Sequence, residues 1–385
     1  MSGNLFVEID NGIIEHNARV MCETFPHKYN IGVVKGNAYG HGYGVVPAMI
    51  RGGINAFAVA RVGEGLAVRA YDKDLPVILL EPVSPEELPV CAENNLSVCI
   101  NDMTALKEAE ESGLSLKLHL KIDSGMSRLG FRDRSEIKAA AERINNNPLL
   151  TLEGVFTHFH TSGAEDREYA DNRARFEELT ADIDLSKIPI VHVDKTQTLI
   201  LHDTPAYANG ARIGIALYGF PTVYDFPDTF KGKLKRLRRN FRNGKNHVEP
   251  CNPIKDLDLK EAFRLKTRVI QVKEINPGDY VGYGFFHRAE NKEHIAVVDV
   301  GYADGIGRKR MGSHMAINGK KYRIVGAVGM SMCQLLVDET VKRGDLVDVL
   351  GGGIPIRTIT VHNGTTMYEL MTNIDSSIPR IYMER

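Results

Sequence analysis

The sequence predicts an α/β chain: an N-terminal (β/α)8 TIM barrel followed by a C-terminal, mostly-β domain. Up to about residue 220, eight short apolar runs alternate with amphipathic stretches of helical periodicity. After about residue 260, turn signals recur at short spacing between β-rich runs. The length of 385 residues accommodates a barrel of about 250 residues and a second domain of about 100.

The eight apolar runs are the expected barrel strands. Helical patterns such as 135–145 and 168–183 lie between them. Strands that alternate with helices in this way are typical of a closed parallel barrel. The runs are Ile31–Val34, Phe57–Ala60, Val77–Leu80, Ser97–Ile100, Leu116–Ile122, Glu153–His158, Ile188–His192 and Asn209–Ile213.

The C-terminal part predicts an antiparallel β domain. Asn318-Gly319 is a strong signal for a two-residue hairpin turn. The opening run Leu5–Ile9 also has strand character, so we expect residues 1–10 to pair with the β domain. The predicted division is a barrel over 1–220, a linker over 221–258 and a β domain over 259–385. The β-rich runs include Ile295–Val300, Tyr322–Val328 and Leu346–Leu350.

Composition restricts the function classes. A net charge of −1 gives no steering toward nucleic acid or an anionic membrane, and no apolar run approaches the length of a bilayer span. The five cysteines are scattered and odd in number, so neither a zinc site nor a disulfide framework is indicated, and we expect no metal. The start of the chain has no signal-peptide pattern, which favours a reduced, cytoplasmic setting.

The linker contains the one strong charge run, with eight basic residues and no acids from Lys231 to Lys245. We interpret it as a solvated segment between the domains. A docking patch for an acidic partner is the alternative.

Lys35 follows the first apolar run directly and precedes a glycine-rich turn, in the segment Val33–Gly42. Partial burial at the end of a strand lowers a lysine pKa, so that the neutral amine can attack a carbonyl and form a Schiff base. The glycines let backbone N–H groups approach an anion, and Tyr39 adds a hydroxyl. This combination suits pyridoxal 5'-phosphate, although a lysine after a strand is most often a solvated strand end.

Four further residues lie at or just beyond the ends of predicted barrel strands. In a β/α barrel the active-site groups project from the C-terminal strand ends, so closure gathers them around one mouth. Taken one at a time, each arginine is explained by a surface ion pair and each histidine by a structural role. One shared site is the simpler explanation for all four residues together. They are Arg128, His158, His192 and Arg212.

Several segments resemble motifs of the alanine racemase family, which are pyridoxal-phosphate enzymes built of a β/α barrel and a β domain. The resemblance covers nearly the whole chain apart from the basic linker. It implies a homodimer with active sites at the interface and a small amino-acid substrate. The segments are Val33–Gly42, Lys121–Gly130, Thr157–His160, Gly210–Ile215, Val300–Gly305 and Ser331–Gln334.

The family's roles carry over onto matching positions. Racemisation needs one base on each face of the α-carbon, and the resemblance assigns Lys35 to one face and Tyr302, from the partner subunit, to the other. It makes Arg212 the residue that faces the pyridine nitrogen and His158 the histidine linked to it. It makes Arg128 the substrate carboxylate ligand and Lys121 a lysine that some members carry as a carbamate. The implied phosphate ligands are Tyr39, Thr196, Gly214 and Ile215, and the implied lining of the substrate carboxylate side is Met332 and Cys333.

The chain departs from the family pattern at three places. Cys333 stands where aspartate is usual, Ser376 where tyrosine is usual, and Lys195-Thr196 where Asn-Ser is usual. Loss of a tyrosine ring widens a pocket, so serine or a broader set of amino acids is an alternative to alanine as substrate.

The resemblance implies interconversion of L- and D-alanine, with D-alanine for cell-wall synthesis as the use. A basic amino-acid decarboxylase is a second enzyme class, and the Gly-Tyr-Ala-Asp-Gly segment at 301–305 speaks against it. A non-catalytic pyridoxal-phosphate-binding protein is the alternative of another class. Such proteins lack the β domain that this sequence predicts.

Overall fold

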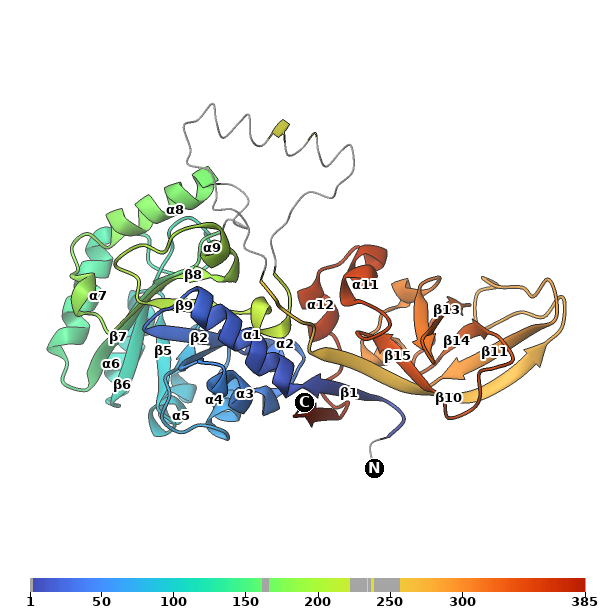
Figure 1. The fold of residues 1–385 in the computed structure, drawn as a ribbon. Helices are drawn as coiled ribbons and strands as arrows, with labels where there is room; N and C mark the ends of the chain where they lie inside the picture. Colours follow the sequence, from blue (N-terminus) through green and yellow to red (C-terminus); the bar gives the residue numbers. More distant parts are fainter. Residues whose placement is uncertain (1–2, 161–165, 222–233, 235–236, 239–256, 385) are drawn as a thin grey trace. The chain divides into compact units, whose positions relative to one another are not determined.

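The structure is a computed structural model that describes residues 3–160, 166–221, 234, 237–238 and 257–384 (Figure 1). Its contacts divide the chain into two units. The barrel unit comprises Glu15–Lys35 and Val46–Lys260, and the β unit comprises Met1–Ile14, Gly36–Val45 and Glu261–Arg385. The basic run 231–245 lies almost entirely outside the described residues. Among the described helices, none has the length and apolarity that crossing a bilayer requires.

The barrel unit contains a closed barrel of eight parallel strands that pair in chain order, which confirms the predicted fold class. Every predicted apolar run overlaps one of these strands. One boundary was wrong: β8 extends to Lys195, so His192 lies inside the strand and not at its end. The strands are β2 (Tyr29–Val33), β3 (Ala56–Val59), β4 (Val77–Leu79), β5 (Leu96–Ile100), β6 (Leu116–Ile122), β7 (Leu150–Thr157), β8 (Ile190–Lys195) and β9 (Gly210–Ile213).

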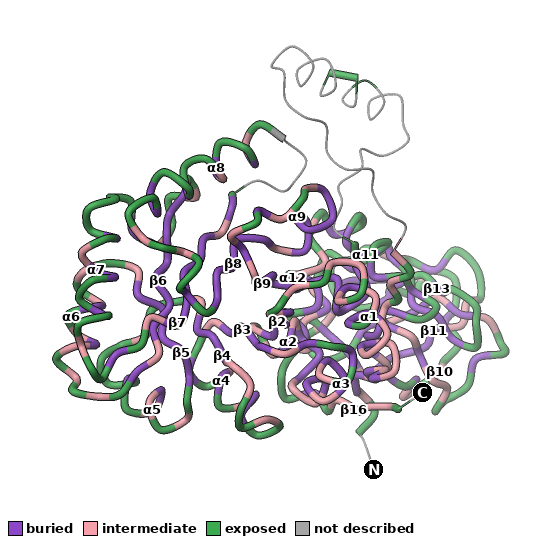
Figure 2. The backbone as a smooth tube through the Cα atoms, turned by 60° about the vertical axis from the view of Figure 1, so that its left-hand side comes forward, coloured by how far each residue is buried: buried purple, intermediate pink, exposed green. Residues whose placement is uncertain are grey.

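Helices cover the outside of this barrel, and the strands between them are mostly buried (Figure 2). Helix α7 shows how the pattern works, because its buried side chains recur at helical spacing. It begins after Asp133, whose carboxylate accepts hydrogen bonds from the Ser135 and Glu136 amides. The helices are α1 (Asn11–Thr24), α3 (Val46–Arg51), α4 (Val62–Arg69), α5 (Leu88–Glu93), α6 (Met103–Glu111), α7 (Arg134–Asn146), α8 (Asp166–Leu179) and α9 (Thr196–Leu201).

The β unit is built on an eight-stranded sheet in the order β11-β14-β13-β12-β15-β10-β1-β16, with β11 also paired to β10. Strand β1 pairs antiparallel with β10 and parallel with β16. The β12–β13 hairpin turns at Asn318 and Gly319, whose φ values of 51° and 80° match the twist that two-residue hairpins need. Its elements are β1 (Phe6–Asp10), β10 (Phe263–Ile275), β11 (Glu293–Val298), β12 (His314–Ile317), β13 (Lys320–Val325), β14 (Cys333–Val337), β15 (Leu346–Leu350), β16 (Arg380–Met383), α11 (Ile356–Asn363) and α12 (Met367–Thr372).

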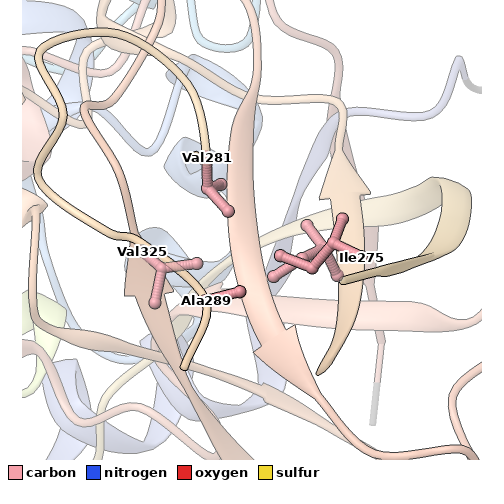
Figure 3. Packing of buried hydrophobic residues seen from close by; sticks show 5 residues of the cluster. Ile275, Val281, Ala289 and Val325 are labelled. Atoms are coloured by element: carbon pink, nitrogen blue, oxygen red, sulfur yellow. The ribbon is translucent and has the colours of Figure 1, made fainter. Parts of the chain in front are cut away.

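A buried apolar cluster anchors the long connection between β10 and β11. Val281 and Ala289 of this connection pack against Ile275, Ile295 and Val325 of the sheet (Figure 3). Full burial of a valine side chain such as that of Val281 contributes about 1.5–3 kcal/mol to the free energy of folding. The connection is therefore held at Val281 and Ala289, while the segment between them presents exposed aromatic side chains to solvent: Tyr283, Phe285 and Phe286.

Candidate active site

The segment that follows β2, α2 (Lys35–Tyr39), is a left-handed turn. The residues Gly36–Tyr39 have φ values from 50° to 63°, and three of these four residues are not glycine. A left-handed conformation costs about 1–2 kcal/mol per non-glycine residue, so the surrounding structure must enforce it. The Gly40 and Gly42 amides donate to the Gly36 and Asn37 carbonyls, and a Cβ at Gly40 would lie only 2.2 Å from the Met371 oxygen.

Acid is expected to destabilise the β unit from about pH 6.5 downward through His41. This side chain has no exposed surface and packs edge-on against Phe263 at 5.1 Å. Burial lowers its pKa from 6.5 to about 3. Across that window the unfolded chain binds a proton that folded His41 does not bind, so unfolding becomes easier by at most about 1.4 kcal/mol per pH unit.

Denaturant unfolding at about pH 7 and about pH 4.5 measures this effect as a difference in the free energy of unfolding. A tenfold change in the unfolding equilibrium constant corresponds to about 1.4 kcal/mol. His41→Gln should flatten the pH dependence, whereas the same change at the exposed His362 should not. Equal slopes for wild type and His41→Gln would contradict the assignment.

Lys35 is half-buried at the mouth of the barrel. Burial lowers the pKa of its amine, Glu81 partly opposes the shift, and Arg128 and Arg212 reinforce it. A lowered pKa increases the neutral fraction of the amine, which is its nucleophilic form.

Arg212, on β9, is 3% exposed and is held by four hydrogen bonds. Its NH1 donates to Nδ1 (2.7 Å) and to the carbonyl (2.6 Å) of His192, and its NH2 donates to the carbonyls of Thr157 (2.7 Å) and Val193 (3.0 Å). The histidine that hydrogen-bonds to Arg212 is therefore His192. The sequence assigned this role to His158, which interacts with Arg212 through charge but forms no hydrogen bond with it among those of the described residues. His192 lies on β8, which neighbours the β9 strand of Arg212, and the pairing of the two strands is irregular between His192 and Asp194.

His158 lies among cations. Burial lowers its pKa well below 6.5, and the charges of Arg212, Lys195, Arg128 and Lys35 add to this shift. It is therefore a neutral histidine surrounded by positive charge, an environment that favours an anionic ligand.

Lys195 is one of these cations. It pairs in register with Arg212 on the neighbouring strand, so the two side chains leave the sheet on the same face. Its Nζ donates to the Phe159 carbonyl at 3.3 Å. Burial, with Arg212 and Arg128, lowers its pKa to about 8. The sequence shows Lys195 where the family usually has asparagine, but the sequence alone assigns it no role.

Two of the residues expected to hold phosphate lie together. The Gly214 amide donates to Oγ1 of Thr196, the first residue of α9, at 3.0 Å. Ile215 begins the 3-10 turn η4 (Ile215–Tyr218), and the Tyr218 hydroxyl donates to the Val33 carbonyl at 2.9 Å. This last bond ties the turn to the strand that leads to the lysine.

Arg128 lies in a tight loop after β6 whose shape depends on Asp123. The Asp123 carboxylate accepts from the Gly125 and Ser127 amides at 3.0 and 2.9 Å. A Cβ at Gly130, where φ is 121°, would lie 2.8 Å from the Asp123 nitrogen. The exposed Arg128 therefore projects from a closed loop of defined shape.

Lys121 is buried inside the barrel. Its Nζ donates to the Leu80 carbonyl at 2.9 Å and lies 5.3 Å from the centre of the Phe156 ring. Burial lowers its pKa, which increases the neutral amine fraction, the form that reacts with carbon dioxide.

In the β unit, Tyr302 opens the 3-10 turn η5 (Tyr302–Asp304) and is 41% exposed. Its amide donates to the Gly329 carbonyl at 2.9 Å, so this turn lies against the loop that carries Met332. Met332 is also exposed, whereas the Cys333 side chain is fully buried and burial raises the pKa of its thiol to about 12. The thiol of Cys333 therefore does not face solvent.

The barrel unit thus gathers eight of the expected site residues: Lys35, Lys121, Arg128, His158, Thr196, Arg212, Gly214 and Ile215. Tyr39, Tyr302, Met332, Cys333 and Ser376 belong to the β unit. Tyr39 is half-buried there, with its ring centre 5.8 Å from that of Tyr368, and burial of its hydroxyl raises the pKa of that group.

These residues fit pyridoxal phosphate. An amine with a lowered pKa suits its carbonyl carbon. The Thr196 hydroxyl, which accepts from the Gly214 amide, keeps its own proton to donate to an anionic phosphate. Buried Arg212 offers a donor that stays protonated.

Comparison with known proteins gives one family. The model described as "Alanine racemase, N-terminal domain" matches residues 9–221, and "Alanine racemase, C-terminal domain" matches residues 262–382. The alanine racemase of Geobacillus kaustophilus is 32% identical over 98% of this chain and 94% of its own length. Alanine racemase 1 of Bacillus subtilis is 30% identical over 98% of this chain and 93% of its own length.

Solved structures give the same result. The crystal structure of alanine racemase from E. faecalis aligns with a TM-score of 0.84 at 29% identity, covering 99% of this chain and 98% of that one. A histidine racemase from Leuconostoc mesenteroides shares the fold, with a TM-score of 0.84 at 23% identity and coverage of 99% and 98%.

Proposed function

The chain belongs to the alanine racemase family, and on this basis we propose that it is a pyridoxal-phosphate-dependent racemase that interconverts L- and D-alanine. The observation that carries the proposal is the half-buried Lys35, with its lowered pKa, at the same barrel mouth as the buried Arg212. A surface lysine at a solvated strand end has neither property.

Each residue has a separate task in this proposal. When bound, pyridoxal phosphate withdraws electrons from the substrate α-carbon and so acidifies its proton. Lys35 exchanges that proton on one face and Tyr302 on the other. Arg128 binds the substrate carboxylate, and Lys121, as a carbamate, orients Arg128. The phosphate ligands are Tyr39, Thr196, Gly214 and Ile215.

Arg212 controls the outcome of the reaction. A guanidinium only donates hydrogen bonds and keeps its proton, so a ring nitrogen facing it stays unprotonated and withdraws electrons weakly. Prompt reprotonation at the α-carbon is then favoured over side reactions such as transamination.

We assign Tyr302 to the active site of a partner subunit in a homodimer. A catalytic phenol that is 41% exposed in the single chain needs a cover that excludes water. The β unit also exposes a group of large apolar side chains, and exposed apolar surface of this kind marks protein contacts. These side chains are Tyr283, Phe285, Phe286, Met330 and Met332.

The substrate range is tested at Ser376, which is exposed after α12. If the missing ring widens the pocket, wild type should racemise L-serine as well as L-alanine. Ser376→Tyr should then lower the serine-to-alanine ratio of kcat/KM by about tenfold, a typical effect of pocket shape. Chirality analysis after incubation with L-alanine, L-serine and L-lysine measures this ratio.

Ser377→Tyr is the matched control, since it adds the same ring one residue away. Strict alanine preference in wild type would exclude the broader-specificity alternative. A cofactor absorbance band without any change of chirality would favour the non-catalytic pyridoxal-phosphate-binding alternative over the racemase.

A further inference from the structure

A line of hydrogen-bonded side chains crosses the interior of the barrel, starting at Arg212. Arg212 NH1 lies 2.7 Å from His192 Nδ1, and His192 Nε2 lies 3.2 Å from His119 Nδ1. His119 Nε2 lies 3.0 Å from the Glu153 Oε2, which also accepts from the Ser97 hydroxyl. Every member is buried, and the five residues come from five different strands, β9, β8, β6, β7 and β5.

The direction of these hydrogen bonds follows from the two ends of the line. A guanidinium only donates, so His192 Nδ1 accepts and its Nε2 must carry the proton. His119 Nδ1 therefore accepts from His192, and its Nε2 donates to the Glu153 carboxylate. A doubly protonated His119 would force His192 to accept at both nitrogens, which a neutral imidazole cannot do.

The barrel is shaped to hold this arrangement. Gly154 lies opposite His119 on β7, and a Cβ there would lie 2.2 Å from His119 Nδ1. The Phe156 ring stacks on His192 at 4.7 Å with an interplanar angle of 7°. Although burial alone would raise the Glu153 pKa, hydrogen bonds from His119 and Ser97 and the charge of Lys117 lower it, so this end of the line is anionic.

We propose that His119 and Glu153 are positioning residues for Arg212: the Glu153 carboxylate, through His119, sets the tautomer of His192 and so holds the guanidinium in place. Four of the five N–H groups of Arg212 are taken up by the acceptors around it, and among the described residues its Nε–H has no acceptor. The line therefore leaves the Nε–H group of Arg212 available to a ligand. This consequence rests on the proposed function, whereas the predicted tautomers of His119 and His192 do not.

The surroundings agree with this assignment. No carboxylate among the described residues hydrogen-bonds to Arg212, although Asp194 acts on its charge from a distance. The line therefore connects a buried cation to a buried carboxylate through two neutral rings. Lys117, 3.6 Å from Glu153 Oε1, completes the far end.

The first test is nuclear magnetic resonance of the holoenzyme labelled with ¹⁵N-histidine. Both rings should show a pyrrole-type Nε2 and a pyridine-type Nδ1, with His119→Gln used to assign the signals. A protonated Nδ1 on either ring, or an imidazolium, would overturn the proposal. This result is independent of catalysis, so it stands even if the chain proves not to racemise amino acids.

The second test is the variant Glu153→Gln, whose amide can donate to His119 and so permits the reverse tautomers. We expect kcat for racemisation to fall about tenfold, comparable to the loss of one buried hydrogen bond, with KM nearly unchanged. The yield of keto acid per racemisation event should rise, because a displaced Arg212 no longer controls the ring nitrogen. Glu142→Gln, an exposed carboxylate on α7, is the matched control and should behave as wild type.

The variant Gly154→Ala tests the positioning role in a second way. It removes no polar group, and its added Cβ would displace the His119 ring. It should reproduce the altered histidine tautomers and the rise in keto acid. If Glu153→Gln and Gly154→Ala, both folded by circular dichroism, keep the wild-type tautomers and product ratio, the positioning role is excluded.

Discussion

Replacing Lys35 with alanine is expected to remove covalent cofactor attachment and to lower the racemisation rate by at least about 10³-fold. The variant loses both the amine that reacts with the cofactor carbonyl and the base for one face of the α-carbon. Burial and two neighbouring arginines lower the pKa of this amine, which sets it apart from an ordinary surface lysine. The absorbance of the lysine-linked cofactor and the rate of L-alanine racemisation measure the loss.

The matched control is Lys28→Ala, an exposed lysine just before the other end of the same strand, which should leave both readouts unchanged. Lys195 and Lys121 are the rival amines, because both also have lowered pKa values. Borohydride reduction followed by peptide mapping distinguishes them. A label on a peptide other than the one containing Lys35 would contradict the assignment.

Replacing Tyr302 with phenylalanine is expected to lower racemisation by about 10²–10⁴-fold, the usual range for loss of one acid–base group. Deuterium exchange at the α-carbon should continue on the face served by Lys35 and stop on the other. This separation is specific to a two-base mechanism, since general misfolding would abolish both. Tyr71→Phe, an exposed tyrosine of the barrel unit, is the control.

Mixing the two inactive variants tests whether an active site is shared between subunits. If Lys35 of one chain works with Tyr302 of another, a dimer of one Lys35→Ala and one Tyr302→Phe chain contains one intact site and one doubly altered site. Random exchange should then restore about a quarter of wild-type activity, because half of the dimers are mixed and each has one working site in two. No recovery after verified subunit exchange would place both bases in the same chain.

The barrel could be predicted from the sequence because its information is local. A fully buried parallel strand appears as a short apolar run, and a covering helix shows its buried stripe at fixed spacing, as Ile137, Ala140 and Ile144 do in α7. The Asn318-Gly319 turn is local for the same reason. Lys35 was also singled out locally, because a lysine that directly follows an apolar run is conspicuous, whereas Tyr302 was assigned only by the resemblance to the alanine racemase family.

What the tertiary structure decided depended on contacts between distant residues. Arg212 hydrogen-bonds to His192, which lies on the neighbouring strand β8, twenty residues away in sequence. His119 and Glu153 lie on neighbouring strands yet 34 residues apart in sequence, so no local pattern joins them. The left-handed turn after Lys35 likewise depends on packing against Met371, more than three hundred residues away, and the energy that enforces it lies in that contact and not in the turn's own residues.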